Sequence, residues 1–236
     1  MSAKPTLRID VWSDIACPWC YVGKRHLEQA LAKFPHAGEV RIVWRAFELD
    51  PKAQRVSDSK VPHLERIARK YGISIAQAQE NRDRLVAIAA RDGLELDFDK
   101  LRSGNTFDAH RLLHLAHERG VQDALKERLM RAYFTEGRAI GDRNELVALA
   151  VEVGLGPDEV RTVLDSDKYA AEVRGDEALA QQLGISGVPF FVLAGKLGVS
   201  GAQPAAVLLE ALGQAWGEIA PAQYAEGAAC GPDGCA

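Results

Sequence analysis

The sequence predicts an α/β fold in which both ends of the chain build one mixed sheet around a large all-helical insert. Strand, helix and strand patterns follow one another in residues 1–50, and two strand patterns and a helix pattern follow one another in 185–220. Neither end has enough strands to bury a sheet alone, so a shared sheet is the economical arrangement. Residues 51–184 show helical periodicity without a convincing strand. We therefore expect a discontinuous sheet domain, an inserted helical domain and a loose C-terminal tail at 221–236.

The N-terminal part of the sheet domain has the pattern of a βαβ unit. Apolar and polar residues alternate over 6–12, which predicts a strand. Apolar residues then recur every three or four positions from Pro18 to Phe34, and Pro35 ends the expected helix. Alternation returns over 40–47. A strand, a helix and a strand in such close succession predict a right-handed crossover and a parallel pair of strands.

The C-terminal part of the sheet domain is predicted to be a hairpin followed by a helix. Strand patterns occupy 189–193 and 197–200, and the turn at 194–196 joins them. Pro204 opens the last helix, whose apolar stripe we expect to be buried. In the insert, helices are expected at 61–71, 75–92, 106–119, 121–136, 142–153, 157–165 and 168–183.

Composition and charge argue against several classes of protein. The 236 residues are 47% hydrophobic and 26% charged, with a formal net charge of −4. Nothing therefore suggests a nucleic-acid partner, which usually meets a basic face. The apolar runs are too short for a membrane span, so no membrane partner is expected. The segment from Met1 to Asp10 contains no apolar signal region, so we expect a cytoplasmic protein in a reducing compartment.

The cysteines indicate chemistry rather than structural support. The chain has four of them, in the close pairs Cys17/Cys20 and Cys230/Cys235, with none between the pairs. In a reducing compartment such thiols are usually catalytic or metal-binding. A zinc site would need a second cysteine pair or a histidine pair close in sequence, and the first pair has only His26 nearby. We therefore favour a redox function for Cys17-Pro-Trp-Cys20 and expect no metal.

The predicted helix gives the two cysteines different roles. Cys17 would lie at the N-terminus of the helix, where free N–H groups and the helix dipole favour an anion. We therefore expect an exposed Cys17 with a lowered pKa, and a more buried Cys20 with a pKa nearer its usual value. Cys17 would attack a substrate disulfide, and Cys20 would then attack the mixed disulfide and release the reduced substrate.

Two segments far apart in sequence carry a resemblance to a known family. Residues 14–23 (DIACPWCYVG) and 187–192 (GVPFFV) resemble the DsbA superfamily of thioredoxin-like oxidoreductases, and in particular its FrnE-type cytosolic members. Residues 105–111 (NTFDAHR) and 201–203 (GAQ) resemble further parts of those proteins. The resemblance implies a thioredoxin-like fold with an inserted helical domain. It also implies a cis bond between Val188 and Pro189 that faces the cysteines.

The resemblance implies a thiol–disulfide oxidoreductase or isomerase that acts on protein disulfides without an organic cofactor. Its expected partners are client proteins and a cellular thiol reductant, such as a thioredoxin system or a low-molecular-weight thiol. Pro18, Trp19, Val188 and Pro189 would shape the client groove. Strongly oxidising members have His where this chain has Trp19, so we expect a more reducing potential than that of DsbA. A sister branch of glutathione-dependent isomerases has Ser in place of Cys17, which makes that activity a poor match.

Two questions stay open in the sequence. Cys230 and Cys235 lie in a tail rich in turn-forming residues, and fit an auxiliary redox pair, half of a metal site or a dispensable end. Some FrnE-like proteins carry such a pair, which favours the auxiliary redox function. The competing class for the whole protein is a chaperone or a soft-metal-binding module that uses the cysteine pairs.

The histidines of the insert have a simpler interpretation. His110, His114 and His117 share one face of the helix expected at 106–119. No carboxylate shares that face, so the three residues predict a polar boundary stripe rather than a metal site. By resemblance, Asn105 and His110 are expected to face the redox site.

Overall fold

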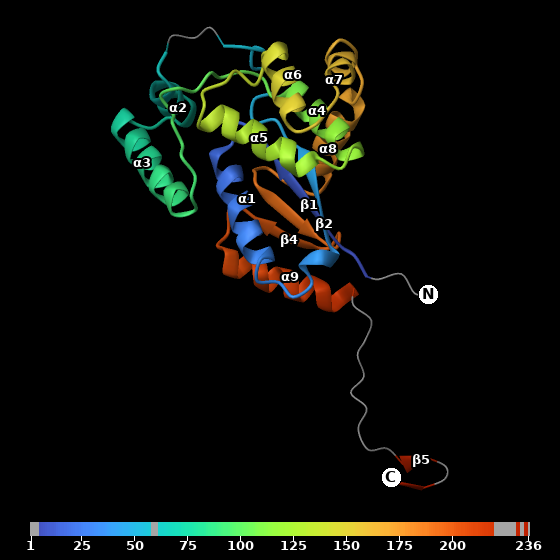
Figure 1. Ribbon diagram of the computed structural model, residues 1–236. Helices are drawn as coiled ribbons and strands as arrows, with labels where there is room; N and C mark the ends of the chain where they lie inside the picture. The colour runs from blue at the N-terminus through green and yellow to red at the C-terminus, as the bar shows by residue number, and fades with distance from the viewer. Residues whose placement is uncertain (1–4, 58–60, 220–229, 232–233, 236) are drawn as a thin grey trace.

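The sheet is built from both ends of the chain, as predicted. The computed structural model describes residues 5–57, 61–219, 230–231 and 234–235. The strands of the main sheet run in the order β2-β1-β3-β4, with β1 and β2 parallel and the other neighbours antiparallel (Figure 1). The mixed sheet, the crossover unit and the hairpin are therefore confirmed. Their bounds are β1 (Leu7–Ser13), β2 (Val40–Ala46), β3 (Phe190–Leu193) and β4 (Leu197–Ser200).

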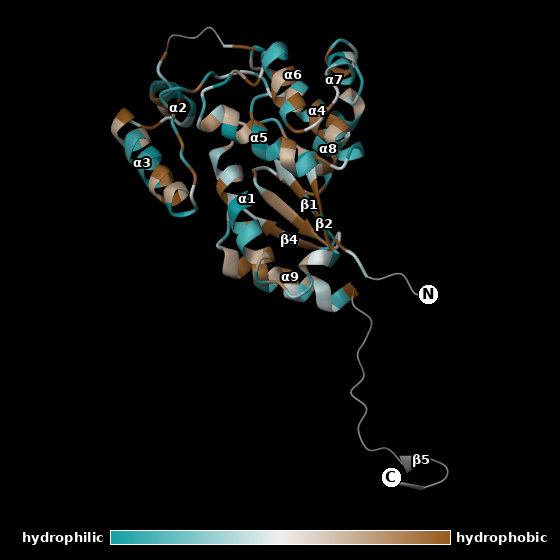
Figure 2. Ribbon diagram, in the orientation of Figure 1, coloured by the Kyte–Doolittle hydropathy of each residue, from teal (hydrophilic) through white to brown (hydrophobic). Residues whose placement is uncertain are grey.

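Two helices cover one face of this sheet. Leu7, Ile9 and Val11 alternate along β1, and each is fully buried. They pack against α1 (Pro18–Leu31) and α9 (Ala205–Ile219), which also contact each other. The period of two in the strand and the apolar stripes of the helices thus meet in one core. In Figure 2 the strands of the sheet are correspondingly brown over much of their length.

The other face of the sheet is covered by α8 (Ala170–Gln182), the last helix of the insert. Asp176 of α8 is buried and joins the helix to the sheet through several contacts. Its carboxylate accepts hydrogen bonds from the Arg45 guanidinium at 2.8 Å and the Ala46 N–H at 3.0 Å. Its carbonyl accepts one from the Trp12 indole N–H at 2.9 Å. These contacts hold the insert against the sheet at the end that leads into β3.

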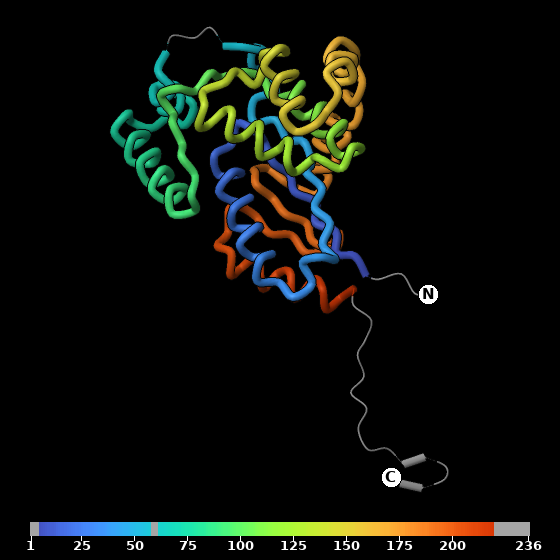
Figure 3. Tube along the Cα trace, in the orientation of Figure 1, coloured from blue at the N-terminus to red at the C-terminus, as the bar shows by residue number. Residues whose placement is uncertain are grey.

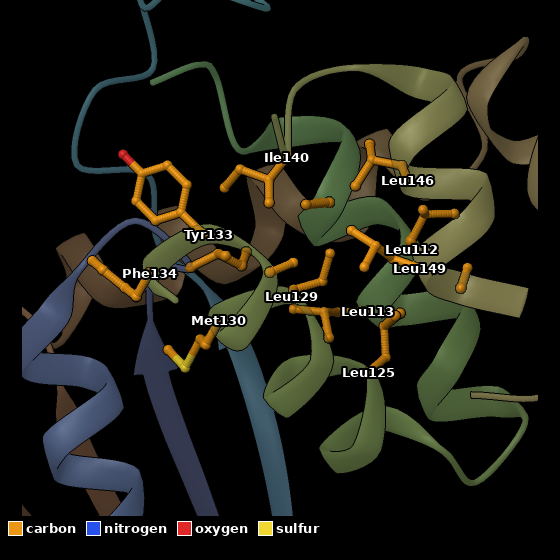
Figure 4. Close-up of a cluster of buried hydrophobic side chains, with 14 of the residues drawn as sticks. Leu112, Leu113, Leu125, Leu129, Met130, Tyr133, Phe134, Ile140, Leu146 and Leu149 are labelled. Carbon is orange, nitrogen blue, oxygen red and sulfur yellow. The ribbon is translucent and has the colours of Figure 1, made fainter. Parts of the chain in front are cut away.

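The insert is helical throughout its regular structure, and the predicted segments are confirmed with ends a few residues shorter. Its core lies mainly between α4, α5 and α6, whose labelled side chains point toward one another in Figure 4. Figure 3 shows the α2–α3 hairpin standing beside the other insert helices. The bounds are α2 (His63–Tyr71), α3 (Ile75–Arg91), α4 (Phe107–Glu118), α5 (Gln122–Phe134), α6 (Arg143–Glu152) and α7 (Pro157–Leu164).

The start of α5 covers the free edge of β2. The Gln122 side chain accepts a hydrogen bond from the Trp44 N–H at 3.0 Å and donates one to the Trp44 carbonyl at 2.9 Å. A side-chain amide thus satisfies the groups that a neighbouring strand would otherwise pair. This contact also fixes the position of α5, which extends from the sheet edge toward the start of α1 (Figure 1).

The tail contains the second cysteine pair. A short antiparallel pair of strands, β5 (Cys230–Gly231) and β6 (Gly234–Cys235), places the backbone of Cys230 opposite that of Cys235. The rest of the tail at 221–236 lies outside the described residues, so its predicted looseness stays a prediction. In the described part of the chain, no helix is long and apolar enough to cross a membrane.

Candidate active site

The two cysteines of the first pair lie at the start of α1, as predicted. Cys17 is the N-cap of the helix and Pro18 occupies its first turn, where a missing N–H leaves no hydrogen bond unmade. The Cys17 N–H donates to the Asp14 carbonyl at 3.3 Å, and the Cys20 N–H donates to the Cys17 carbonyl at 3.1 Å. Both cysteines are free thiols. Cys20 therefore lies one turn into the helix, close enough to Cys17 for the two sulfurs to interact.

The predicted exposure of Cys17 is wrong. Cys17 is 5% exposed and Cys20 is fully buried. The cause is the insert, because both cysteines belong to the same apolar core as Leu129 and Phe134 of α5. Trp19, which lies between the two cysteines in sequence, is 41% exposed. The cysteine pair is thus covered by packing that comes from residues more than a hundred positions away.

The loop before β3 lies against the cysteines. The Val188–Pro189 bond is cis, as the resemblance implied. The Cys17 Sγ lies 3.6 Å from the Val188 carbonyl oxygen. Gly23 of α1 lets the helix approach, since a Cβ there would come within 2.9 Å of Pro189 Cγ. The structure thereby brings Val188 and Pro189 to the Cys17 end of α1.

The two thiols titrate differently from the prediction. The hydrogen bond that the Cys17 thiol makes to Cys20, together with burial, raises the pKa of Cys17 well above its usual value. Burial by itself would raise the pKa of Cys20, but the Cys17 thiol, the Lys126 ammonium and the Ser13 hydroxyl outweigh it and lower that pKa. The pair thus loses its first proton from Cys20, and Cys17 keeps a proton that it shares with the Cys20 sulfur.

Asp14 is a buried carboxylate between β1 and the first cysteine. It accepts hydrogen bonds from the Leu49 N–H at 2.8 Å and the Ala16 N–H at 3.3 Å. Burial opposes its charge, but contact with His110, the Leu49 N–H and the nearby Lys126 outweigh burial and lower the pKa of Asp14. Asp14 therefore contributes a fixed negative charge beside the redox pair.

The predicted boundary stripe holds for His114 and His117, which are half-buried, but not for His110. His110 is buried, and its Nε2 lies 3.4 Å from Asp14 Oδ1. The Nε2 of His114 lies 3.1 Å from Asp176 Oδ2. The histidine face of α4 carries no carboxylate, but Asp14 and Asp176 from other elements lie against it. Within the described residues, no group of three or more His, Cys, Asp or Glu side chains could hold a metal ion.

His110 reaches the redox site through Asp14, which agrees with the expectation from the resemblance. Asn105 instead donates to Glu48 Oε1 at 3.0 Å. Glu48 is buried just after β2, and Arg174 of α8 also binds it. Asn105 thus joins the insert to the sheet domain through Glu48. The next residue, Leu49, donates its N–H to Asp14.

Sequence reasoning missed Lys126, a fully buried lysine of α5. Its ammonium donates to the Ser13 carbonyl at 3.2 Å and lies 5.5 Å from the centre of the Trp44 ring. Burial lowers the pKa of Lys126 to about 8, although the neighbouring Cys20 and Asp14 act in the opposite direction. The available signal was its place on the buried face of α5, one turn after the buried Gln122.

The second cysteine pair is placed only by its backbone. Cys230 and Cys235 are directly opposite in the β5–β6 ladder. Their side chains lie outside the described residues, so the auxiliary redox function stays a prediction.

Comparisons with known proteins agree with this arrangement. The chain is 52% identical to the probable DsbA oxidoreductase SCO1869 from Streptomyces coelicolor, whose crystal structure matches with a TM-score of 0.85 over 98% of each chain. It is 29% identical over 192 residues to the uncharacterised protein YwbO from Bacillus subtilis (strain 168), which covers 80% of this chain and 87% of YwbO.

More distant structures share the fold. The cytosolic disulfide reductase DsbM from Pseudomonas aeruginosa matches with a TM-score of 0.60 and 18% identity, over 88% of this chain and 98% of DsbM. The model of the DSBA-like thioredoxin domain matches residues 8–213, which include the sheet, the cysteine pair and the whole insert. The chain therefore belongs to the family of proteins with a DSBA-like thioredoxin domain.

Proposed function

We propose that this protein is a thiol–disulfide oxidoreductase that reduces or isomerises disulfides of client proteins through Cys17 and Cys20. The observation that carries the proposal is a free, hydrogen-bonded thiol pair at the start of α1, against the carbonyl of Val188. Two thiols that share one proton can form a disulfide by losing two electrons and that proton. The family membership and the FrnE-type sequence around the pair support the same chemistry.

The first step uses Cys17 as the nucleophile. Cys17 is the less buried of the two, and it hydrogen bonds to a Cys20 sulfur with a lowered pKa. As Cys17 Sγ attacks a client disulfide, its proton passes to the Cys20 thiolate. A Cys17–client disulfide forms, the client S–S bond breaks, and one client sulfur leaves as a thiolate. Cys20 therefore acts as the base in this step.

The second step uses Cys20 as the resolving thiol. Once deprotonated, Cys20 Sγ attacks Cys17 Sγ and forms the Cys17–Cys20 disulfide. The bond between Cys17 and the client breaks, and the second client sulfur leaves with the electron pair. The client has then gained two electrons, and the enzyme must be reduced by a cellular thiol before the next cycle.

The client would bind along the loop before β3. Ser186 and Gly187, just before Val188, are exposed, and a client strand can pair with the backbone of this loop by β-strand addition. Trp19, 41% exposed next to the thiols, offers an apolar surface for a client side chain. Pro18 fixes the turn that presents Trp19. We propose these four residues as the client-binding surface.

Insulin reduction tests the proposal. Cys17→Ser should abolish turnover. Cys20→Ser should accumulate the mixed disulfide, because its resolving thiol is missing, although the mixed disulfide should form more slowly without the base of the first step. An enzyme that keeps turnover after Cys17→Ser would contradict the assignment. If the wild-type protein shows no turnover but protects a client from aggregation, the alternative of a chaperone or soft-metal-binding module is favoured instead.

The cellular setting is part of the proposal. We propose a cytoplasmic protein reduced by a thioredoxin system or a low-molecular-weight thiol, in keeping with the shared fold of cytosolic DsbM. We also propose that Cys230 and Cys235 pass electrons to the first pair. Changing both to serine should slow turnover with a macromolecular reductant while leaving the potential of Cys17–Cys20 unchanged. Unchanged turnover would argue against this transfer.

A further inference from the structure

Lys126 takes no part in the two steps above, although it is a buried cation close to the cysteines. It is fully buried on α5, and the Ser13 carbonyl, 3.2 Å away, accepts one of its three N–H groups. The face of the Trp44 ring lies 5.5 Å from Nζ and adds a weak attraction. Taking an ammonium out of water is costly unless an anion compensates for the lost hydration. The position of Lys126 therefore points to an anion nearby.

The turn of α5 that carries Lys126 packs beside the cysteines, because Leu129 and Met130, three and four residues after Lys126, share one apolar core with Cys17 and Cys20. Cys20, Asp14 and Cys17 each favour the charged form of the lysine, with Cys20 contributing most. Lys24 of α1 opposes it. The interaction is mutual, because Lys126 also favours the thiolate of Cys20.

We infer that Lys126 accepts the proton of Cys20 and holds this sulfur as a thiolate in the resolving step, so that the helical insert supplies a charged group of the redox centre. The inference rests on the proposed oxidoreductase function. In the mixed disulfide, Cys17 no longer has a thiol that can hydrogen bond to Cys20, and Cys20 carries the proton received in the first step. Another group must then stabilise the anion.

The step balances with Lys126 as the proton acceptor. In the mixed disulfide no thiolate faces Lys126, and its buried ammonium releases a proton to solvent. The Cys20 S–H bond then breaks, and the proton joins the Lys126 amine to give an ammonium beside a thiolate. The thiolate attacks Cys17 Sγ, the Cys17–client bond breaks, and the client thiolate takes a proton from water. No anion remains on the oxidised pair, so the buried ammonium then releases its proton to solvent.

The other charged groups around the site do not replace Lys126. His110 of α4 lies against Asp14, and Asp14 carries a negative charge that disfavours a thiolate. Lys24 of α1 forms ion pairs with Glu28, Asp123 and Glu127. The Lys126 ammonium, in contrast, lowers the pKa of Cys20.

A chain with Cys20 as its sole cysteine tests the inference. With Cys17, Cys230 and Cys235 changed to serine, the thiolate absorbance of Cys20 is titrated against pH. Lys126→Met should raise the pKa of Cys20 by about one unit, a tenfold loss of thiolate, whereas Lys126→Arg should keep it low. Lys24→Met, which removes another buried lysine, should leave the titration unchanged. An unchanged pKa in Lys126→Met, or an equal shift in Lys24→Met, would overturn the inference.

A second measurement needs no variant at Lys126 and decides the matter if Lys126→Met does not fold. The side-chain NMR signals of Lys126 in the wild-type protein are followed against pH in the reduced and oxidised states. Because linkage is reciprocal, the pKa of Lys126 should fall when the Cys17–Cys20 disulfide removes the thiolate. Equal pKa values in the two states would refute the inference. Neither measurement uses client turnover, so failure of the proposed function would be seen separately in the insulin assay.

Discussion

Gly23 offers a direct test of the packing between α1 and the loop before β3. A Cβ at this position would lie 2.9 Å from Pro189 Cγ and 3.4 Å from Phe191 Cζ. Carbon atoms pack best at about 3.5–4.0 Å. Gly23→Ala must therefore displace the proline ring or α1 by roughly half an ångström. Since Cys17 is at the start of the same helix, the change acts on the redox site as well as on stability.

Two opposing terms set the magnitude. Overpacking of a well-packed core costs about 1–3 kcal/mol, whereas alanine gains about 1 kcal/mol over glycine inside a helix. The free energy of unfolding should therefore fall by about 0–2 kcal/mol. Gly213→Ala in α9 is the matched control, because nothing lies within 4 Å of a Cβ there. It should gain about 0.5–1 kcal/mol, so the two variants should differ by about 1–3 kcal/mol.

Urea unfolding at constant m-value measures the two free energies. Insulin reduction measures the effect on the site, where a shift of α1 against the loop should alter the contact between Cys17 Sγ and the Val188 carbonyl, now 3.6 Å. We expect slower turnover in Gly23→Ala and wild-type turnover in Gly213→Ala. If Gly23→Ala is stabilised as much as the control and keeps full turnover, the described packing is wrong.

Three further predictions concern the insert, the buried carboxylate and the potential. Gly141→Ala should destabilise the protein by more than about 3 kcal/mol, because the added Cβ would lie 1.6 Å from the Arg55 carbonyl oxygen. Urea unfolding measures the loss of stability, and a loss below about 1 kcal/mol would contradict the prediction. Asp14→Asn should cost about 2–4 kcal/mol at pH 7. The folded pKa of Asp14 is lowered, so its contribution is complete above the unfolded pKa of about 3.9 and is lost as pH falls through the folded pKa. Unfolding at pH 7 and near pH 3 should therefore show a smaller difference between wild type and variant in acid, and an equal difference would refute the assignment. Finally, Trp19 offers no cation to the thiolate, so the reduction potential should be more reducing than the value of about −120 mV for DsbA. Equilibration with glutathione measures the potential, and a potential as oxidising as that of DsbA would refute this expectation.

Local periodicity was enough to predict the fold. The alternation along β1 and the spacing of apolar residues in α1 both reflect which side of each element is buried, and burial on one side is visible in sequence. The ends were less certain. The helix predicted to continue to Phe34 stops at Leu31, because the chain must already turn toward β2.

The charges of the site could not be predicted because they depend on contacts between distant residues. Lys126 and the Ser13 carbonyl are 113 positions apart. Its place on the apolar face of α5 is visible in the sequence, but the groups that surround it there are not. The helix-start argument for Cys17 was sound for an exposed thiol, but burial and the hydrogen bond to Cys20 outweigh the helix dipole. The burial of His110 could not be predicted for the same reason, since Asp14 approaches it from another element.

The contacts of α1 argue that the sheet domain and the insert fold as one cooperative unit, although the sequence divides them at 51 and 184. The apolar core of the insert includes Cys17, Cys20 and Tyr21 of the redox segment. The Tyr21 hydroxyl donates to Glu127 of α5 at 2.7 Å, and Arg25 binds the same carboxylate. An isolated sheet domain would expose these apolar side chains and leave the buried charges without partners. The free-energy cost of each would be a large fraction of the net stability of a domain. The insert is therefore a structural part of the cysteine site rather than a lid attached to it, and changes in its core should affect Cys17 and Cys20.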